Sequence, residues 1–379
     1  MPEALPLAAS FLAAFLLSLL VVLLGRRGFG IDAHAGLRRK LHGQPVPRVG
    51  GLALMGAAGI GGALSIARDA GVAGAFLGLL GCALPCFAGG LTDDLSAGVH
   101  PRARLALMSV SALLALLVLD VRVARIDVEA IDAVLRNPWL GGTLTLLALL
   151  TITNGINLID GLNGLAGGTS LAMFAGLALV AQAVGDPLVL HASLVLAAAT
   201  AGFLVWNFPG GRLFLGDGGA YLLGFLLGAL SVLLVARNPT VSAWFPPLLL
   251  AYPLTEVAFS VWRRRVQRSG GVATADAAHL HHLIYRRAVR WRTGSGAIED
   301  RELRNALASI YLWTLSAAAI VPAVLLHAHG AALAGALALF VSAYVWLYAR
   351  IARLRTPRRM ILRGRRAHRT GEGGPNARR

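Results

Sequence analysis

Long apolar runs separated by short polar gaps fill most of this 379-residue chain. Many of the runs approach the roughly 20 residues that a membrane-spanning helix needs. Only 14% of the residues are charged and 56% are hydrophobic, whereas a soluble domain carries roughly 25% charged residues. We therefore predict an all-α polytopic membrane protein with eleven spans, ten being the alternative count. The predicted spans are residues 5–25, 50–67, 73–91, 105–120, 140–153, 165–184, 188–206, 219–236, 242–262, 306–327 and 331–349.

The distribution of basic residues predicts the orientation of these spans. With the N-terminus outside, 30 of the 35 lysines and arginines fall in segments that become cytoplasmic, which is a strong positive-inside bias. This bias explains the net charge of +17 without nucleic acid. We expect a single transmembrane domain over residues 1–349 and a basic cytoplasmic tail over 350–379 that faces lipid headgroups. The predicted cytoplasmic loops are 26–49, 92–104, 154–164, 207–218 and 263–305.

Polar side chains recur at every third position of residues 154–164, namely Asn154, Asn157, Asp160 and Asn163. Steps of three residues drift around an ideal helix, so these side chains do not form one face. Nearby glycines weaken the helix further. We predict a frayed helix end that opens into a loop at the membrane surface, with the amides and the carboxylate turned toward one cavity. The alternative is an ordinary helix–helix turn rich in Asn and Gly.

Three aspartates in the predicted cytoplasmic loops suggest a metal site. Asp93 and Asp94 end the third span, where two acids oppose the helix dipole. Mg²⁺ binds proteins through one or two carboxylates plus substrate phosphates, so we favour metal binding over a polar helix end paired with Arg102 or Arg104. Asp217 lies in a glycine-rich turn that follows Asn207, a setting that suits a phosphate, an ion or a plain turn.

Basic and imidazole side chains form a second group of candidates. Arg48 follows a proline-rich approach to the membrane and is suited to bind a phosphate through two hydrogen bonds. His279, His281 and His282 lack the cysteine partners and the spacing of a zinc site, and they better suit an anionic diphosphate. Glu256 lies inside the ninth span. An acid at that depth is expected to orient a neighbouring helix or a basic residue of the site.

Together these stretches resemble the polyprenyl-phosphate N-acetylhexosamine-1-phosphate transferases, the WecA/MraY family. The similarity covers residues from about 30 to 290, and its motifs follow the family's order. The H-x-H-H form and the eleven spans resemble the WecA branch more than the muramoyl-pentapeptide branch. The motifs are Lys40-Leu41-His42, Pro45-Val46-Pro47-Arg48-Val49-Gly50-Gly51, Asp93-Asp94, the 154–164 stretch, Asn207, Phe214-Leu215-Gly216-Asp217-Gly218-Gly219 and His279-Leu280-His281-His282.

The resemblance implies transfer of a sugar-1-phosphate from a UDP-N-acetylhexosamine to a polyprenyl phosphate, with release of UMP. It implies Mg²⁺, with Mn²⁺ as a substitute, and a location in the bacterial cytoplasmic membrane with the site facing the cytoplasm. Such a step starts a lipid-linked envelope glycan, and the chain is expected to act alone or as a homodimer. The implied catalytic residues are Asp93, Asp94 and Asp217, which together with Asp160 are the implied metal ligands. The implied substrate contacts are Arg48, Asn154, Asn157, Asp160, Asn163, Asn207, His279, His281 and His282.

Two positions depart from the family pattern, and other functions stay open. The family often has a second acid where this chain has Asn163, and a serine where it has Ala220. Asn163 is compatible with activity if that position only donates or accepts hydrogen bonds. A multi-pass transporter is the alternative from another class, because broken polar helices and an acid such as Glu256 also occur in transporters. A muramoyl-pentapeptide transferase and a metal-dependent membrane phosphatase are the remaining alternatives.

Overall fold

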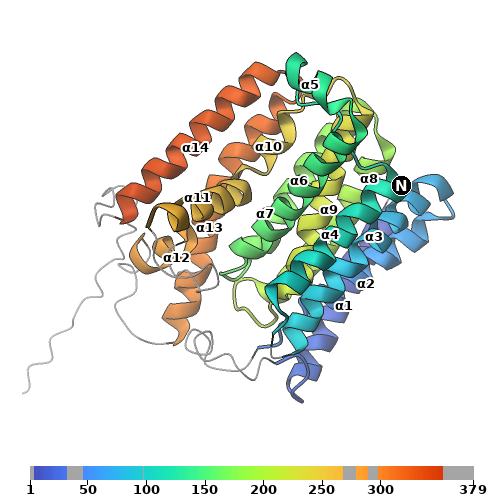
Figure 1. Ribbon diagram of the computed structural model, residues 1–379. Coiled ribbons are helices and arrows are strands. Elements are labelled where there is room, and N and C mark those ends of the chain that lie inside the picture. Colours follow the sequence, from blue (N-terminus) through green and yellow to red (C-terminus); the bar gives the residue numbers. More distant parts are fainter. Residues whose placement is uncertain (1–3, 32–45, 97, 268–278, 289–297, 353–379) are drawn as a thin grey trace, which may run out of the picture.

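The computed structural model describes residues 4–31, 46–96, 98–267, 279–288 and 298–352 (Figure 1). Within these ranges the regular elements are helices, apart from one isolated bridge between Ile31 and Pro47. The predicted all-α fold is therefore confirmed. The elements are α1 (Ala4–Gly25), α2 (Gly50–Ser65), α3 (Ala70–Leu95), α4 (Pro101–Leu119), α5 (Glu129–Leu135), α6 (Pro138–Ile159), α7 (Leu165–Val184), α8 (Pro187–Asn207), α9 (Gly216–Arg237), α10 (Phe245–Leu249), α11 (Ala251–Gln267), α12 (Leu280–Leu283), η2 (Ile284–Ala288), α13 (Ile298–Leu325) and α14 (Gly330–Ala352).

Nine of the described helices are long and apolar enough to cross a membrane, and α2 is a shorter apolar helix. These ten helices correspond to ten of the eleven predicted spans, so the polytopic architecture is confirmed. The assignment of the N-terminus to the outside and of the tail to the cytoplasm stays a prediction. The Lys40-Leu41-His42 motif and residues 353–379 of the basic tail lie outside the described residues.

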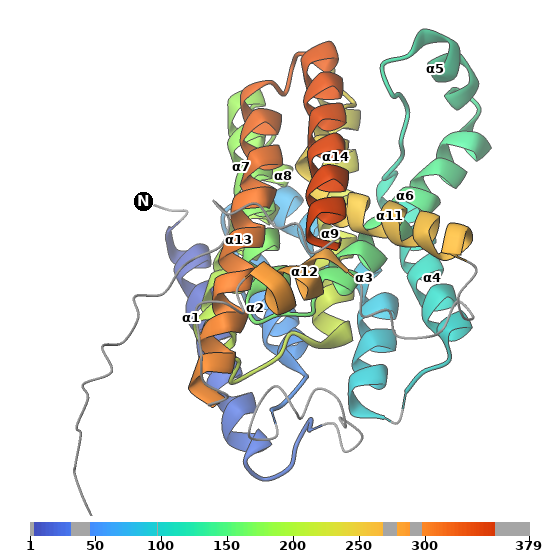
Figure 2. The same ribbon diagram turned by 90° about the vertical axis from the view of Figure 1, so that its left-hand side faces the viewer.

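The predicted ninth span, residues 242–262, is wrong as a single helix. The chain forms the five-residue α10, leaves helical geometry at Leu250 and continues as α11. The break falls between Pro246-Pro247 and Pro253, whose rings and missing N–H groups interrupt helical hydrogen bonding. In Figure 2, α11 runs across the direction of α13 and α14 instead of alongside them. The apolar run therefore supplies an inclined helix that leans out from the bundle.

Helix α9 forms the centre of the bundle, packed between α3 and α6. In its membrane-spanning stretch, 94% of the residues are buried within the protein, as expected for a helix that is hydrophobic on every side. A Cβ atom on Gly224 would lie 2.7 Å from the Thr153 Cα atom of α6, so this glycine permits the close approach. The first turn of α9 carries Asp217. The most buried helix thus holds a candidate acid in a fixed place.

Polar side chains tie the loops together at the end of the bundle away from Asp217. Asp186 accepts hydrogen bonds from Arg237 Nε at 2.8 Å and from Asn238 Nδ2 at 3.0 Å. Asp127 accepts from the Ser242 hydroxyl at 2.7 Å and pairs with Arg125. These contacts join the ends of neighbouring helices.

Candidate active site

The segment that carries Arg48 is held against the start of α9 by backbone pairing. The Phe214 N–H donates to the Pro47 carbonyl at 2.9 Å, and the Gly50 N–H donates to the Phe214 carbonyl at 3.0 Å. The Arg48 N–H itself donates to the Gly30 carbonyl at 2.9 Å. Two motifs that are far apart in the sequence therefore meet in space. Arg48 reaches the site because its backbone is fixed on both sides.

Glycines let α2 and α3 pack directly on the first turn of α9. A Cβ atom on Gly51 would lie 2.4 Å from the Gly219 nitrogen, and one on Gly90 would lie 2.5 Å from the Asp217 carbonyl carbon. Gly216 has φ +75°, a conformation that other L-residues rarely adopt. The glycine-rich turn predicted around Asp217 thus serves close helix packing as well as the position of the acid.

Asp94 is buried and bonded to the start of α9. Its Oδ1 atom accepts the Asp217 N–H at 2.9 Å and its Oδ2 atom accepts the Gly218 N–H at 3.0 Å. Asp94 as a whole is 4% exposed. N–H groups in the first turn of a helix lack partners within the helix, and a carboxylate there is favoured by the helix dipole. Asp94 therefore caps α9 from a neighbouring helix.

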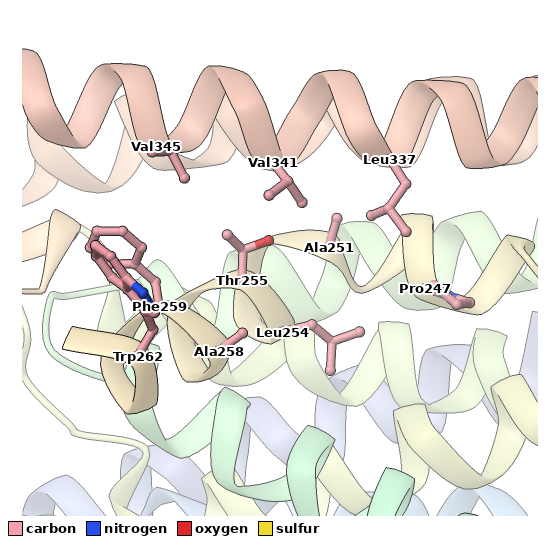
Figure 3. Close-up of a pocket in the computed structure, with 10 residues that line it drawn as sticks. All are labelled: Pro247, Ala251, Leu254, Thr255, Ala258, Phe259, Trp262, Leu337, Val341 and Val345. Carbon is pink, nitrogen blue, oxygen red and sulfur yellow. The ribbon is translucent and has the colours of Figure 1, made fainter. Parts of the chain in front are cut away.

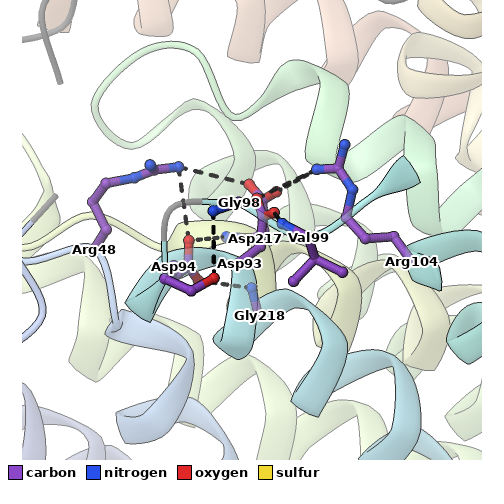
Figure 4. Close-up of polar contacts among 9 residues, drawn as sticks. Arg48, Asp93, Asp94, Gly98, Val99, Arg104, Asp217 and Gly218 are labelled. Carbon is purple, nitrogen blue, oxygen red and sulfur yellow. Dashed lines mark hydrogen bonds and ion pairs between the residues drawn. The ribbon is translucent and has the colours of Figure 1, made fainter. Parts of the chain in front are cut away.

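Asp93 and Asp217 lie together, with a guanidinium group on either side of the cluster (Figure 4). Arg104 Nη1 lies 3.3 Å from Asp93 Oδ2 and 3.2 Å from Asp217 Oδ2. Arg48 Nη2 lies 3.7 Å from Asp94 Oδ1 and also 3.7 Å from Asp217 Oδ1. Arg104 therefore pairs with Asp93 and Asp217. Pairing of the helix-end acids with Arg102 or Arg104 was the alternative to a metal site that the sequence left open. The structure thus brings together Asp93, Asp94 and Asp217.

The cluster does not form a ready-made site of three or more carboxylate ligands. Across the described part of the chain, no group of three or more His, Cys, Asp or Glu side chains is arranged to hold a metal ion. Both Asp94 oxygens already accept backbone N–H groups. Asp93 Oδ2 and Asp217 Oδ2 lie 3.3 Å and 3.2 Å from the same Arg104 nitrogen, and their oxygens suit Mg²⁺. The residues present therefore fit a Mg²⁺ ion that takes its other ligands from phosphates and water.

The predicted frayed helix over residues 154–164 is partly wrong. Helix α6 continues to Ile159, so Asn154 and Asn157 lie on the helix, and Asp160 is its C-terminal cap residue. The apolar neighbours Ile156 and Ile159 are fully buried, and their packing stabilises the extra turns. Asn154 is exposed. Asn157 interacts with the Asp217 carboxylate. Among these polar side chains, Asn157 is thus brought to the acid cluster.

Asn163 and Asn207 are bonded to backbone groups of neighbouring loops. Asn163 Nδ2 donates to the Pro209 carbonyl at 3.1 Å. Asn207 accepts the Gly164 N–H at 2.7 Å through Oδ1 and donates to the Leu213 carbonyl at 2.7 Å through Nδ2. Both residues are buried. The geometry assigns them to bracing the loops, and their predicted contact with substrate stays a prediction. The amide donor of Asn163 has a role here that a carboxylate cannot fill.

Three residues of α13 hold the same loop from the other side. Asn305 Oδ1 accepts the Asn163 N–H at 2.7 Å, and the Ser309 hydroxyl donates to the Asn163 carbonyl at 2.7 Å. Trp313 Nε1 donates to the Gly164 carbonyl at 3.1 Å. These three residues were not among those predicted from the sequence. Their spacing of four residues, which places polar groups along one face of a helix, is the signal that was available.

The histidines pack beside this loop. A Cβ atom on Gly161 would lie 2.4 Å from His281 Nε2. His281 stacks on His279 with ring centroids 5.5 Å apart. Burial, aided by repulsion from His282 and His279, holds the pKa of His281 well below its usual range, so its ring is neutral at pH 7. His279 is 8% exposed and His281 is 1% exposed. The phosphate contacts predicted for His279, His281 and His282 stay predictions.

An apolar groove of about 460 Å³ lies between α11 and α14. Figure 3 shows side chains of both helices facing it, including Phe259 and Trp262 from α11 and Val341 from α14. Thr255 and Trp262 supply the polar atoms among its lining side chains. The groove follows from the inclination of α11, because a helix leaning away from the bundle leaves an opening along its flank. Such a surface suits a hydrocarbon chain.

Comparison with known proteins gives one family. The model of glycosyl transferase family 4 matches residues 76–235. A probable undecaprenyl-phosphate N-acetylglucosaminyl 1-phosphate transferase of Bacillus subtilis is 37% identical over 147 residues, which are 38% of this chain and 41% of that protein. An undecaprenyl-phosphate alpha-N-acetylglucosaminyl 1-phosphate transferase of Thermotoga maritima is 30% identical over 67% of this chain and 73% of that protein. A phospho-N-acetylmuramoyl-pentapeptide-transferase of Moorella thermoacetica is 33% identical over 34% of this chain and 42% of that protein.

Proposed function

Because the chain belongs to glycosyl transferase family 4, we propose that it transfers an N-acetylhexosamine 1-phosphate from a UDP-sugar to a polyprenyl phosphate, releasing UMP. The observation that carries the proposal is the cluster of Asp93, Asp94 and Asp217 between Arg48 and Arg104. The Bacillus and Thermotoga relatives are named as transferases of this kind. Their names make UDP-N-acetylglucosamine the first donor to test.

The reaction is a displacement at phosphorus. An oxygen of the lipid phosphate bonds to the β-phosphorus of the UDP-sugar, and the bond from that phosphorus to the bridging oxygen breaks. UMP leaves with the bridging oxygen. The attacking phosphate is largely ionised at neutral pH, so no strong base is required. The barrier comes mainly from bringing two anions together and from charge that develops at the transferred phosphoryl group.

Arg48 and Arg104 are placed to meet that charge. Each guanidinium lies within 4 Å of Asp217, so the acids hold both cations at the site before substrate arrives. Guanidinium groups bind phosphate oxygens through paired hydrogen bonds. When a phosphate enters the cluster, each arginine can exchange its carboxylate partner for a phosphate oxygen. Arg48 and Arg104 thus bind and orient the phosphates.

Asp93 and Asp217 are the residues that we assign to Mg²⁺. When bound, the ion neutralises and aligns the phosphates of the two substrates. Asp94 fixes the backbone of Asp217 through its two accepted N–H groups. Asn157 is placed to orient the Asp217 side chain. Asp160, the fourth predicted ligand, caps α6 and is assigned to nucleotide or sugar.

The groove between α11 and α14 is assigned to the prenyl chain. It is lined mainly by apolar side chains, with polar atoms on Thr255 and Trp262. A lipid in the groove would place its hydrocarbon in the membrane and its phosphate near the membrane surface. The positive-inside bias of the sequence supports an assignment of this site to the cytoplasmic side of the membrane.

A reconstituted assay tests the proposal. Purified full-length chain in detergent receives polyprenyl phosphate, Mg²⁺ and a panel of UDP-sugars that includes UDP-N-acetylmuramoyl-pentapeptide, and UMP is measured. UMP that forms only with the lipid acceptor supports a transferase, and the active donor separates the two branches of the family. Nucleotide release without lipid would indicate a hydrolase. Flux of solute into liposomes without UMP would indicate the transporter.

A further inference from the structure

A buried acid within the bundle is paired with the first histidine of the H-x-H-H motif. Glu256 on α11 is 1% exposed. Its Oε2 atom lies 3.3 Å from His279 Nδ1, and the Ser260 hydroxyl lies 3.2 Å from the same nitrogen. Glu256 and Ser260 are one helical turn apart on α11, so their side-chain oxygens both point toward His279 Nδ1. The sequence predicted that Glu256 orients a neighbouring helix or a basic residue of the site, and the structure places its carboxyl group beside His279.

Two buried tyrosines also lie beside Glu256. The hydroxyl groups of Tyr252 on α11 and Tyr344 on α14 lie beside its carboxyl group. Both tyrosines are fully buried. Burying an acid in such a place costs free energy unless a partner compensates it. Among the described residues, His279 is the ion-pair partner of Glu256.

Contacts lead from this pair to the candidate active site. The rings of His279 and His281 stack with an angle of 6° between their planes. His281 in turn packs against Gly161, the neighbour of Asp160. A shift of the His279 ring would therefore move the surface on which the 160–164 loop rests.

We propose that Glu256 is a positioning residue that orients His279 toward an anionic ligand. The carboxylate accepts a hydrogen bond from Nδ1–H, which fixes the tautomer and the rotation of the ring. The remaining ring nitrogen, Nε2, is then held for the diphosphate of a nucleotide. This assignment rests on the proposed function for the identity of the ligand. Glu256 itself contacts no substrate.

A purely structural role for Glu256 makes a different prediction. If the acid only secures α11 against α14, its replacement weakens the fold whether or not His279 is present. If it acts through His279, removal of the imidazole removes the effect. A double-mutant cycle separates the two because it measures whether two changes add.

The cycle uses the full chain as wild type, Glu256→Gln, His279→Ala and the double variant. UDP, as the probe, is titrated calorimetrically in Mg²⁺, and UMP release is measured in parallel with polyprenyl phosphate and the active UDP-sugar. We expect Glu256→Gln to weaken UDP binding about tenfold and to have no further effect in the His279→Ala background. Tyr344→Phe, which removes a hydroxyl beside the same acid but leaves the pair intact, should bind UDP like the wild type.

The outcomes are distinct. Additive losses in UDP affinity, or an unchanged affinity in Glu256→Gln, would overturn the positioning role, as would a wild-type chain that does not bind UDP. If UDP binding shows the non-additive pattern while no lipid-dependent UMP appears, the proposed transfer reaction fails and the positioning role stands. A loss in Tyr344→Phe equal to that in Glu256→Gln would indicate a general packing effect and also overturn the proposal.

Discussion

The Asp94 carboxylate accepts the backbone N–H of Asp217 at 2.9 Å, so an acid at the end of α3 fixes the position of an acid at the start of α9. The two residues carry the same functional group but have different surroundings. Asp94 accepts a backbone N–H at each oxygen and also lies 3.7 Å from Arg48, whereas the Asp217 carboxylate faces Arg48, Arg104 and Asp93. The structure thereby separates a positioning acid from an acid that is placed to meet a ligand.

Asp217→Asn should abolish turnover without unfolding the protein. The amide keeps the shape of the side chain but removes the charge that holds both arginines and the proposed Mg²⁺. We expect UMP release to fall at least about 100-fold and the thermal midpoint to stay near that of the wild type. Asp120→Asn, at a side chain that is 81% exposed, is the matched control. Retained turnover in Asp217→Asn would remove this residue from the site.

Asp94→Asn should lower stability and turnover together. An asparagine presents one oxygen, and its NH₂ group would face an N–H donor of Asp217 or Gly218. Leaving a buried donor unpaired costs about 1–3 kcal/mol. The expected result is a lower thermal midpoint in detergent and slower UMP release. A variant that loses turnover at unchanged stability would instead show that Asp94 contacts the substrate or the metal.

Gly51→Ala should separate the Arg48 segment from α9. The new methyl group would lie 2.4 Å from the backbone nitrogen of Gly219, and backbone atoms cannot rotate away as a side chain can. Overpacking of this kind costs about 1–3 kcal/mol. We expect a lower thermal midpoint and a higher KM for the UDP-sugar. Gly59→Ala on the same helix is the control, because a Cβ atom there meets nothing within 4 Å.

Ser309→Ala should lower kcat clearly while reducing the stability of the fold only slightly. It removes the hydrogen bond to the Asn163 carbonyl and so loosens the loop that follows Asp160. We expect kcat to fall about tenfold and stability to fall by about 1 kcal/mol. Ser316→Ala on the same helix deletes a buried hydroxyl that bonds the Leu312 carbonyl of its own helix. Equal kcat in the two variants would contradict the bracing role of α13.

The segment of residues 279–288, which carries the histidines, should open more readily as pH falls below about 6.5, the pKa of a free histidine. Burial first, and then repulsion from His282 and His279, holds the pKa of His281 well below that value in the folded state. The opened segment therefore binds a proton at a pH where the folded segment does not, and folding weakens by up to about 1.4 kcal/mol per pH unit.

Hydrogen exchange of residues 279–288, corrected for its intrinsic pH dependence, measures this effect. The free energy of opening should be constant above pH 7 and should decrease toward pH 5.5. His281→Gln should remove most of the decrease. A wild-type segment equally protected at both pH values would show that His281 does not control it.

The sequence alone determined that this chain forms a membrane bundle and which residues gather at one end of it. Long apolar runs predict helices because a membrane excludes unpaired backbone polar groups. Asp93 and Asp94 were predicted because two acids at the end of a membrane helix are costly without a compensating cation, and the family resemblance added Asp217. These signals are local, so the printed sequence contains them in full.

Tertiary structure decided which polar groups face a ligand and which face the protein. Asn163 and Asn207 have the same side chain as Asn157, yet their amides are used by backbone groups of Pro209, Gly164 and Leu213. The residues of α13 that hold this loop lie more than 140 positions away from it. Local spacing cannot encode such pairing, because a hydrogen bond depends on which backbone atoms folding brings within about 3 Å.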